Sequence, residues 1–278
     1  MRARWVVRIV GVVLFVLLVA ATIQGTRTAI ERRAYPTPGR LVDLGTHQLH
    51  LQCTGEGAPV VVLEAPAAGV SVSWGWVQPA VARVTRVCSY DRAGLGWSWR
   101  PDGEYDPDAA PAELARALEG EPGPFVVVGH GLGAGFARLF AARYPGQTAA
   151  LVLVDDPTRV GTSPEDGFIA RSPSLWPWLA RFGVLRVDHV LSRSAVGLPE
   201  PQHGALIAFL NRPDHLMQAA QELAYADAIA ERAAAASVAP VPVKQLEVLG
   251  GRRIAFLASP ADADRVSTAI IDTVEALR

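Results

Sequence analysis

Cysteine is scarce in this 278-residue chain, which contains only Cys53 and Cys88. Two cysteines are too few for a disulfide scaffold, and their spacing does not match the paired ligands of a zinc site. From the residues alone, both are interpreted as buried apolar thiols. We therefore expect no metal centre.

The sequence also lacks an excess of charge of either sign. It has 26 lysines and arginines against 27 aspartates and glutamates, which gives a formal net charge of −1. An even balance provides no basic surface for nucleic acid and no acidic tail. We expect a small molecule or a protein as partner, no nucleic acid and no cofactor.

One long apolar run covers residues 9–23 and follows three arginines, the last of them Arg8. Counted from Trp5, the run approaches the roughly 20 residues needed to cross a bilayer, because Arg8 can reach toward the headgroups. A cleaved signal peptide would look similar, but the end of the run is a poor small-x-small cleavage site. We expect an uncleaved single-pass anchor and tether over residues 1–32. Arginines flank the anchor on both sides, so the positive-inside rule orients it only weakly. We expect the globular part outside the cytoplasm.

Beyond the tether, short apolar runs alternate with helical patterns, which predicts a mostly parallel sheet covered by helices. The early strands are predicted at residues 41–44, 47–53, 60–63, 86–90, 125–128 and 150–154, with helices at 76–82, 110–118 and 133–143. Strand patterns return at residues 243–249 and 254–257, and a last helix at 266–277. A single domain is expected over residues 33–278.

Strand patterns disappear between residues 157 and 236. The apolar residues there have helical spacing, which predicts an inserted helical lid. These residues are Trp176, Trp178, Leu179, Phe182, Leu185, Ile207 and Phe209. They are interpreted mainly as the core of the lid, with an apolar ligand surface as the alternative.

The most informative motif lies at residues 129–133, where a buried strand breaks into glycines and becomes a helix. The sequence there is Gly-His-Gly-Leu-Gly. A strand, a tight turn and a helix form the nucleophile elbow, G-x-S-x-G, whose turn exposes a serine hydroxyl. The flanking glycines are present, but Gly131 stands in the place of the serine.

Four segments together resemble the α/β-hydrolase superfamily, in particular its bacterial membrane-anchored members. They are residues 61–69, 85–98, 129–133 and 150–155, and the turn YDRAGLGWS at residues 90–98 is the most specific match. Family members usually have glycine where Pro66 stands. The resemblance implies an α/β-hydrolase fold with a helical lid.

The catalytic triad implied by the resemblance is degenerate in this chain. Acyl transfer needs a nucleophile, a histidine base and an acid that orients the base. Gly131 leaves the first role empty, and no histidine follows His215. The loop that normally carries the acid is reduced to residues 250–253.

Several other residues are assigned by position. His130 is interpreted as structural, and Asp155 as a possible acid, although turn or cap roles are expected for Asp155 and its neighbour. The backbone amides of Ala67 and Leu132 correspond by family analogy to a vestigial oxyanion site. His203 and His215 are expected on the surface of the helical lid. His47 and His50 are expected on the early hairpin, far from the elbow.

The family's sheet order also bears on the cysteines. It places the strand that ends at Cys53 antiparallel to the strand that begins near Cys88. In an oxidising compartment, a disulfide then becomes an alternative to two free thiols.

Three functions remain open from the sequence. The first is a catalytically inactive pseudoenzyme that binds a small apolar ligand or a protein partner at the membrane. The second is an active hydrolase of ester or acyl substrates with an unrecognised mechanism. The third is dinucleotide binding, because Gly129, Gly131 and Ala134 also fit the Rossmann fingerprint, with Asp155 as the acidic residue on the next strand.

Overall fold

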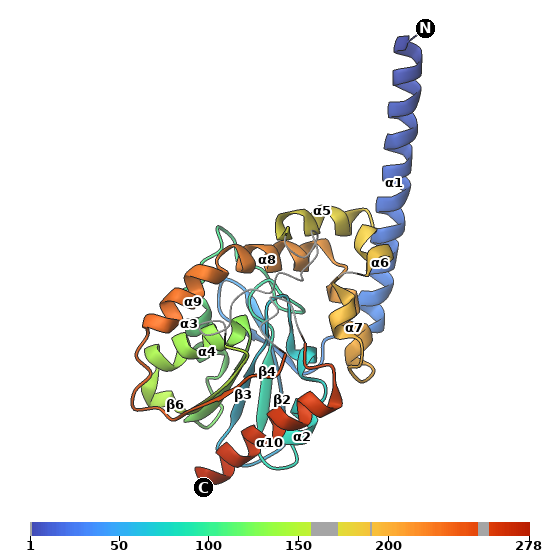
Figure 1. The fold of residues 1–278 in the computed structure, drawn as a ribbon. Coiled ribbons are helices and arrows are strands. Elements are labelled where there is room, and N and C mark those ends of the chain that lie inside the picture. The colour runs from blue at the N-terminus through green and yellow to red at the C-terminus, as the bar shows by residue number, and fades with distance from the viewer. Residues whose placement is uncertain (1, 157–171, 190, 250–255) are drawn as a thin grey trace.

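A seven-stranded sheet forms the centre of the computed structural model, which describes residues 2–156, 172–189, 191–249 and 256–278 (Figure 1). The strand order is β1-β2-β4-β3-β5-β6-β7. The first two pairs are antiparallel, and every other pair is parallel. The mostly parallel sheet predicted from the sequence is confirmed. The strands are β1 (Arg40–Asp43), β2 (Gln48–Thr54), β3 (Val61–Glu64), β4 (Val87–Tyr90), β5 (Phe125–His130), β6 (Thr148–Val154) and β7 (Val243–Leu246).

Helices cover both faces of the sheet because its central strands are apolar on both sides. In the β3 segment, Val60 and Val62 pack toward α3 (Ala110–Ala117) and α4 (Leu132–Arg143). The alternate residues of β3 pack toward α2 (Val77–Val81) and α10 (Pro260–Ala276). This period of two is the expected signature of a strand buried on both faces. Two short 3₁₀ helices, η1 (Ser71–Trp74) and η2 (Pro145–Gln147), complete this part.

Among its described residues, the chain between β6 and β7 contains helices joined by turns and loops, and no strand. Residues 157–171 and 190 of the predicted lid lie outside the described residues. This helical insert contains η3 (Pro173–Leu175), α5 (Trp176–Arg181), α6 (Val184–Asp188), η4 (Ser192–Ala195), α7 (Gln202–Phe209), α8 (Pro213–Ala224) and α9 (Ala226–Ala235). Trp176 is fully buried in a cluster with Phe136 of α4 and Ala67. The insert therefore packs over the end of the sheet that carries the elbow.

The N-terminal helix α1 (Arg2–Ala34) extends away from the rest of the molecule (Figure 1). Among the described residues, it is the one helix long and apolar enough to cross a membrane, with a mean hydropathy of 2.8 in its most apolar window. A membrane anchor and a signal sequence both fit these properties. The C-terminal part of α1 contacts the insert, where Arg186 pairs with Glu31 at 2.6 Å.

The predicted element boundaries differ from the structure near the C-terminus. Strand β7 ends at Leu246 rather than at residue 249, because the Asp155 carboxylate accepts the backbone N–H groups of Val248 and Leu249. Residues 254 and 255 of the predicted strand 254–257 lie outside the described residues, and the two that follow are not in a strand. Helix α10 begins six residues early, at Pro260, a residue favoured in the first turn of a helix.

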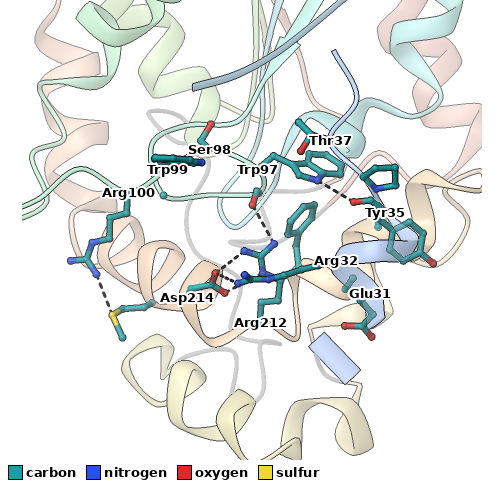
Figure 2. Close-up of a pocket in the computed structure, with 17 residues that line it drawn as sticks. Glu31, Arg32, Tyr35, Thr37, Trp97, Ser98, Trp99, Arg100, Arg212 and Asp214 are labelled. Atoms are coloured by element: carbon teal, nitrogen blue, oxygen red, sulfur yellow. Dashed lines mark hydrogen bonds and ion pairs between the residues drawn. The ribbon is translucent and has the colours of Figure 1, made fainter. Parts of the chain in front are cut away.

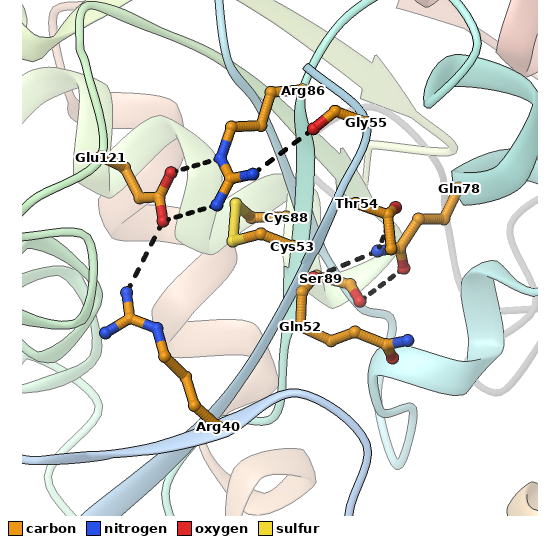
Figure 3. The surroundings of a disulfide bond; sticks show 10 residues. All are labelled: Arg40, Gln52, Cys53, Thr54, Gly55, Gln78, Arg86, Cys88, Ser89 and Glu121. Carbon is orange, nitrogen blue, oxygen red and sulfur yellow. Dashed lines mark hydrogen bonds and ion pairs between the residues drawn. A yellow bond between two sulfur atoms is a disulfide. The ribbon is translucent and has the colours of Figure 1, made fainter.

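Cys53 and Cys88 form a disulfide that joins β2 to β4 (Figure 3). The two residues are direct partners in the antiparallel ladder, so the alternative of two free thiols is wrong in this structure. Glu121 lies close to both sulfurs but pairs with Arg86 at 2.6 Å. Because a disulfide has no thiolate, this group does not form a metal site.

Candidate functional site

The glycines of the elbow are fixed by close backbone contacts. A Cβ atom on Gly129 would lie 2.4 Å from the Gly133 carbonyl oxygen, and one on Gly133 would lie 2.4 Å from the Glu64 carbonyl oxygen. Neither position can accept a side chain. The sharp turn from β5 into α4 therefore depends on both residues, as expected for a nucleophile elbow.

Gly131 differs from its two neighbours because a side chain would fit there. The nearest atom to a Cβ on Gly131 would be Pro66 Cβ at 3.6 Å, an ordinary van der Waals distance. Its backbone has φ 53° and ψ −124°, a conformation that is strained for residues with a side chain. The turn thus has the geometry that presents a nucleophile, and its central residue has no side chain.

Ala67 and Leu132, whose amides correspond by family analogy to an oxyanion site, directly follow Pro66 and Gly131 in the chain. Ala67 and Leu132 are both buried, and among the described residues neither amide N–H has a hydrogen-bond acceptor. The carbonyl oxygen of Pro66 accepts a hydrogen bond from Arg92 at 3.1 Å. Because C=O and N–H point in opposite directions across a trans peptide, this contact directs the Ala67 N–H away from Arg92.

Arg92 is the centre of a buried ionic cluster that supports this loop. Its guanidinium is 2.8 Å from carboxylate oxygens of both Glu64 and Glu222, and all three side chains are almost completely buried. It also donates to the Ala65 carbonyl at 2.7 Å and lies over the Phe136 ring. Arg92 therefore joins β3, α4 and the insert around the elbow.

His130 and Asp155, two of the residues selected from the sequence, are neighbours. His130 Nε2 lies 3.4 Å from Asp155 Oδ2, and both side chains are buried. The same carboxylate accepts the N–H groups of Val248 and Leu249. Burial acts to raise the pKa of Asp155, but His130 and these amides outweigh it and lower that pKa. An ionised carboxylate that already has three partners argues against the ribose contact required for dinucleotide binding.

His215 was predicted to lie on the surface, and this prediction is wrong. The side chain is 1% exposed, and its Nδ1 accepts the Gly96 N–H at 3.1 Å. Its Nε2 donates to the Ala68 carbonyl at 3.1 Å. Both ring nitrogens are thus engaged in joining α8 to the loops beside the elbow, which leaves neither of them for proton transfer.

Acid is expected to destabilise the protein through His215. Burial and the nearby Arg212 lower the pKa of His215 to about 4, whereas an unfolded histidine titrates near pH 6.5. The contribution of neutral His215 to the free energy of unfolding is therefore complete above about pH 6.5. As the pH falls toward 4, the free energy of unfolding decreases by up to about 3 kcal/mol. Urea unfolding at several pH values should show a smaller acid sensitivity for His215→Phe than for the wild type. Equal pH dependence of the two proteins would contradict this role.

A second group resembles a catalytic triad but cannot act as one. His50 Nδ1 lies 3.1 Å from Asp91 and 3.4 Å from Ser71 Oγ, and its Nε2 contacts the Pro38 carbonyl. Serine and aspartate share one ring nitrogen, so the histidine cannot pass a proton between them. Burial acts to lower the pKa of His50, but Asp91 and Pro38 outweigh it and raise that pKa. The group fixes the tether and the turn at residues 90–98.

The remaining histidines also lie away from the elbow turn. His47 is buried with its Nε2 3.2 Å from Glu113, whereas His203 pairs with Glu200 on the surface of the insert. His189 is exposed at the end of α6. The shortened loop predicted at residues 250–253 lies outside the described residues.

Two cavities lined by described residues lie where α1 meets the domain, and Gly131 lines neither of them. One, of about 730 Å³, is lined by α1, the turn after β4 and the start of α8 (Figure 2). Within it, Arg32 and Arg212 both point toward Asp214. The second, of about 570 Å³, has Trp74 and Trp97 in its wall and is more apolar.

Comparison with known proteins agrees with this architecture. Residues 57–277 match the model of the alpha/beta hydrolase family. Among solved structures, the epoxide hydrolase CorEH superposes with a TM-score of 0.66 at 17% identity, covering 86% of this chain and 99% of that one. A thermophilic esterase from Thermogutta terrifontis superposes with a TM-score of 0.61 at 19% identity, covering 86% of this chain and 99% of the esterase. At such identities the structural likeness shows the fold alone.

Curated relatives match over a shorter region. The 2-hydroxy-6-oxo-2,4-heptadienoate hydrolase of Pseudomonas putida is 33% identical over 120 residues, which is 42% of this chain and 44% of that protein. The 2-hydroxymuconate semialdehyde hydrolase of Pseudomonas sp. is 31% identical over 125 residues, or 43% and 44%. The match thus spans less than half the length of these relatives. With the family model covering most of the sequence, the chain belongs to the alpha/beta hydrolase family.

Proposed function

We propose that this protein is a membrane-anchored pseudoenzyme, which binds a small apolar ligand or a protein partner at the membrane without hydrolysing it. The observation that carries the proposal is Gly131. It has the backbone conformation of a nucleophile position and room for a side chain, yet it offers no reacting atom.

The histidines support the same conclusion. Acyl transfer needs a histidine within hydrogen-bond reach of the nucleophile. His50 and His215 each use both ring nitrogens, and His130 is buried against Asp155. A serine at position 131 alone would therefore lack a base.

The elbow still offers groups that can hold a ligand. The amides of Ala67 and Leu132 can donate to a carbonyl or carboxylate oxygen, as an oxyanion site does. Leu132 and Phe136 belong to the apolar cluster that the insert forms above them. A ligand with one polar oxygen and an apolar body fits this combination.

The membrane location is proposed from α1 and from the disulfide. The apolar half of α1 is exposed along its length, as a lipid-facing helix would be. Disulfides persist mainly outside the cytoplasm, so the Cys53–Cys88 bond supports an extracytoplasmic globular part.

An active hydrolase is the second candidate, because the curated relatives are named as hydrolases. In that case Asp155 would be the acid, and another group would have to supply the nucleophile. The two candidates differ in whether the purified chain turns over an ester.

Hydrolysis of p-nitrophenyl esters tests the proposal. We expect the full-length protein to show no turnover above a heat-inactivated sample, and Gly131→Ser to show none either, because the base is missing. Gly131→Ala is the matched control, since it adds the same backbone strain of about 1–3 kcal/mol without a hydroxyl. Turnover by the wild type would contradict the proposal, and turnover by Gly131→Ser but not Gly131→Ala would show that a base is present.

A further inference from the structure

The end of the apolar run in α1 lies directly against the helical insert. Residues 5–23 form about 28 Å of helix, close to the roughly 30 Å of a bilayer core. Gln24 follows at once and is buried, donating to the Asn211 carbonyl at 2.7 Å. Its Oε1 accepts from Arg186 at 2.6 Å. The first residue after the apolar run is therefore already packed in the insert.

These contacts fix the insert relative to α1. The Arg186 guanidinium also binds both carboxylate oxygens of Glu31 at 2.6 Å, so one side chain holds α1 at two points. Arg32 adds a pair with Asp214 at 3.0 Å. Because α1 is one continuous helix, its direction sets the orientation of α5 and α6 relative to the membrane.

The insert exposes large apolar side chains close to this junction. Val187 is 83% exposed and Trp178 is 65% exposed. Trp178 and Met217 also line a groove of about 390 Å³ between α5 and α8. We name this the lid surface, which consists of Leu175, Trp178, Val184, Val187 and Met217, all of them exposed.

The lid surface belongs to the end of the domain from which α1 emerges. Figure 1 shows α5 crossing this end of the domain, with α6 beside α1 and the C-terminal helix α10 at the opposite end. Helix α5 also contacts α1 directly. The lid surface is thus level with the end of the apolar run.

We propose that the lid surface docks on the bilayer interface in which α1 is anchored. Tryptophan beside arginine is typical of residues at the headgroup level, and the exposed Arg181 of α5 lies in the same groove as Trp178. Continuity with α1 selects the bilayer as the occupant over a soluble partner. The inference rests on the proposed anchoring of α1 and adds that the insert itself is seated on lipid.

Site-specific fluorescence in lipid nanodiscs tests this inference on the full-length chain. Both native cysteines are in the disulfide, so one added cysteine can be labelled with the polarity-sensitive dye NBD. Trp178→Cys reports on the lid surface, and Val13→Cys reports on the anchor. Trp99→Cys is the matched control, because Trp99 is also an exposed tryptophan, with 60% of its surface accessible. It lines the same cavity as Arg32, and Arg32 lies about 12 Å along α1 from Gln24, on the side away from the apolar run.

We expect the dye at position 178 to have blue-shifted emission and to be quenched by lipids with a nitroxide near the headgroup, while the dye at position 99 remains water-like. Water-like emission from the dye at position 178, with lipid-like emission from the dye at position 13, would overturn the docking of the lid surface but not the anchoring of α1. Water-like emission at 13 would refute both. A blue shift at 178 without nitroxide quenching would show that protein covers the surface, which also overturns the inference.

Discussion

Replacing Arg92 with methionine is expected to lower the free energy of unfolding by about 3–5 kcal/mol. The reason is that Glu64 and Glu222 would remain buried without their common partner, and two backbone carbonyls would lose a donor. Chemical denaturation of the full-length protein measures this loss.

Two further variants make the Arg92 prediction specific. Arg232→Met removes an arginine whose pair with Asp108 is largely exposed, and such a pair contributes at most about 1 kcal/mol. Adding Glu222→Leu to Arg92→Met should restore part of the stability, because one unpaired charge is then removed. A loss for Arg92→Met no larger than that for Arg232→Met would show that the cluster does not hold the elbow loop.

Removing the disulfide with Cys53→Ala and Cys88→Ala is expected to cost about 3–4 kcal/mol. The bond closes a loop with a sequence separation of 35, and a cross-link of that span restricts the unfolded chain by this amount. Denaturation with and without reductant gives the measurement. The wild type should lose stability on reduction, whereas the double variant should not respond, and equal stability of the two oxidised proteins would contradict the prediction.

The sheet and the elbow were predictable because their signals are local. A buried strand, glycines at fixed positions and a following helix occupy one continuous stretch at residues 125–143. Close contacts at Gly129 and Gly133 explain why this pattern must contain glycine. The family resemblance then supplied the strand order, and with it a Cys53–Cys88 disulfide as an alternative to two free thiols.

The supports of the site were not predictable from local signals. Arg92 and Glu222 are 130 positions apart in the sequence, and nothing near either residue indicates the other. His215 lies next to Pro213 and Asp214 in a polar stretch, which is typical of an exposed helix start, yet the fold buries it against Ala68. Such contacts depend on how the insert lies over the sheet, which spacing and composition do not encode.

A covalent probe tests the central claim of an elbow without a nucleophile. The full-length protein is incubated with a fluorophosphonate, and its intact mass is measured before and after. We predict no adduct on the wild type, because Gly131 has no hydroxyl, and none on Gly131→Ser, because no histidine is placed to activate it. A single stoichiometric adduct on the wild-type chain that is lost after heat inactivation would contradict the account.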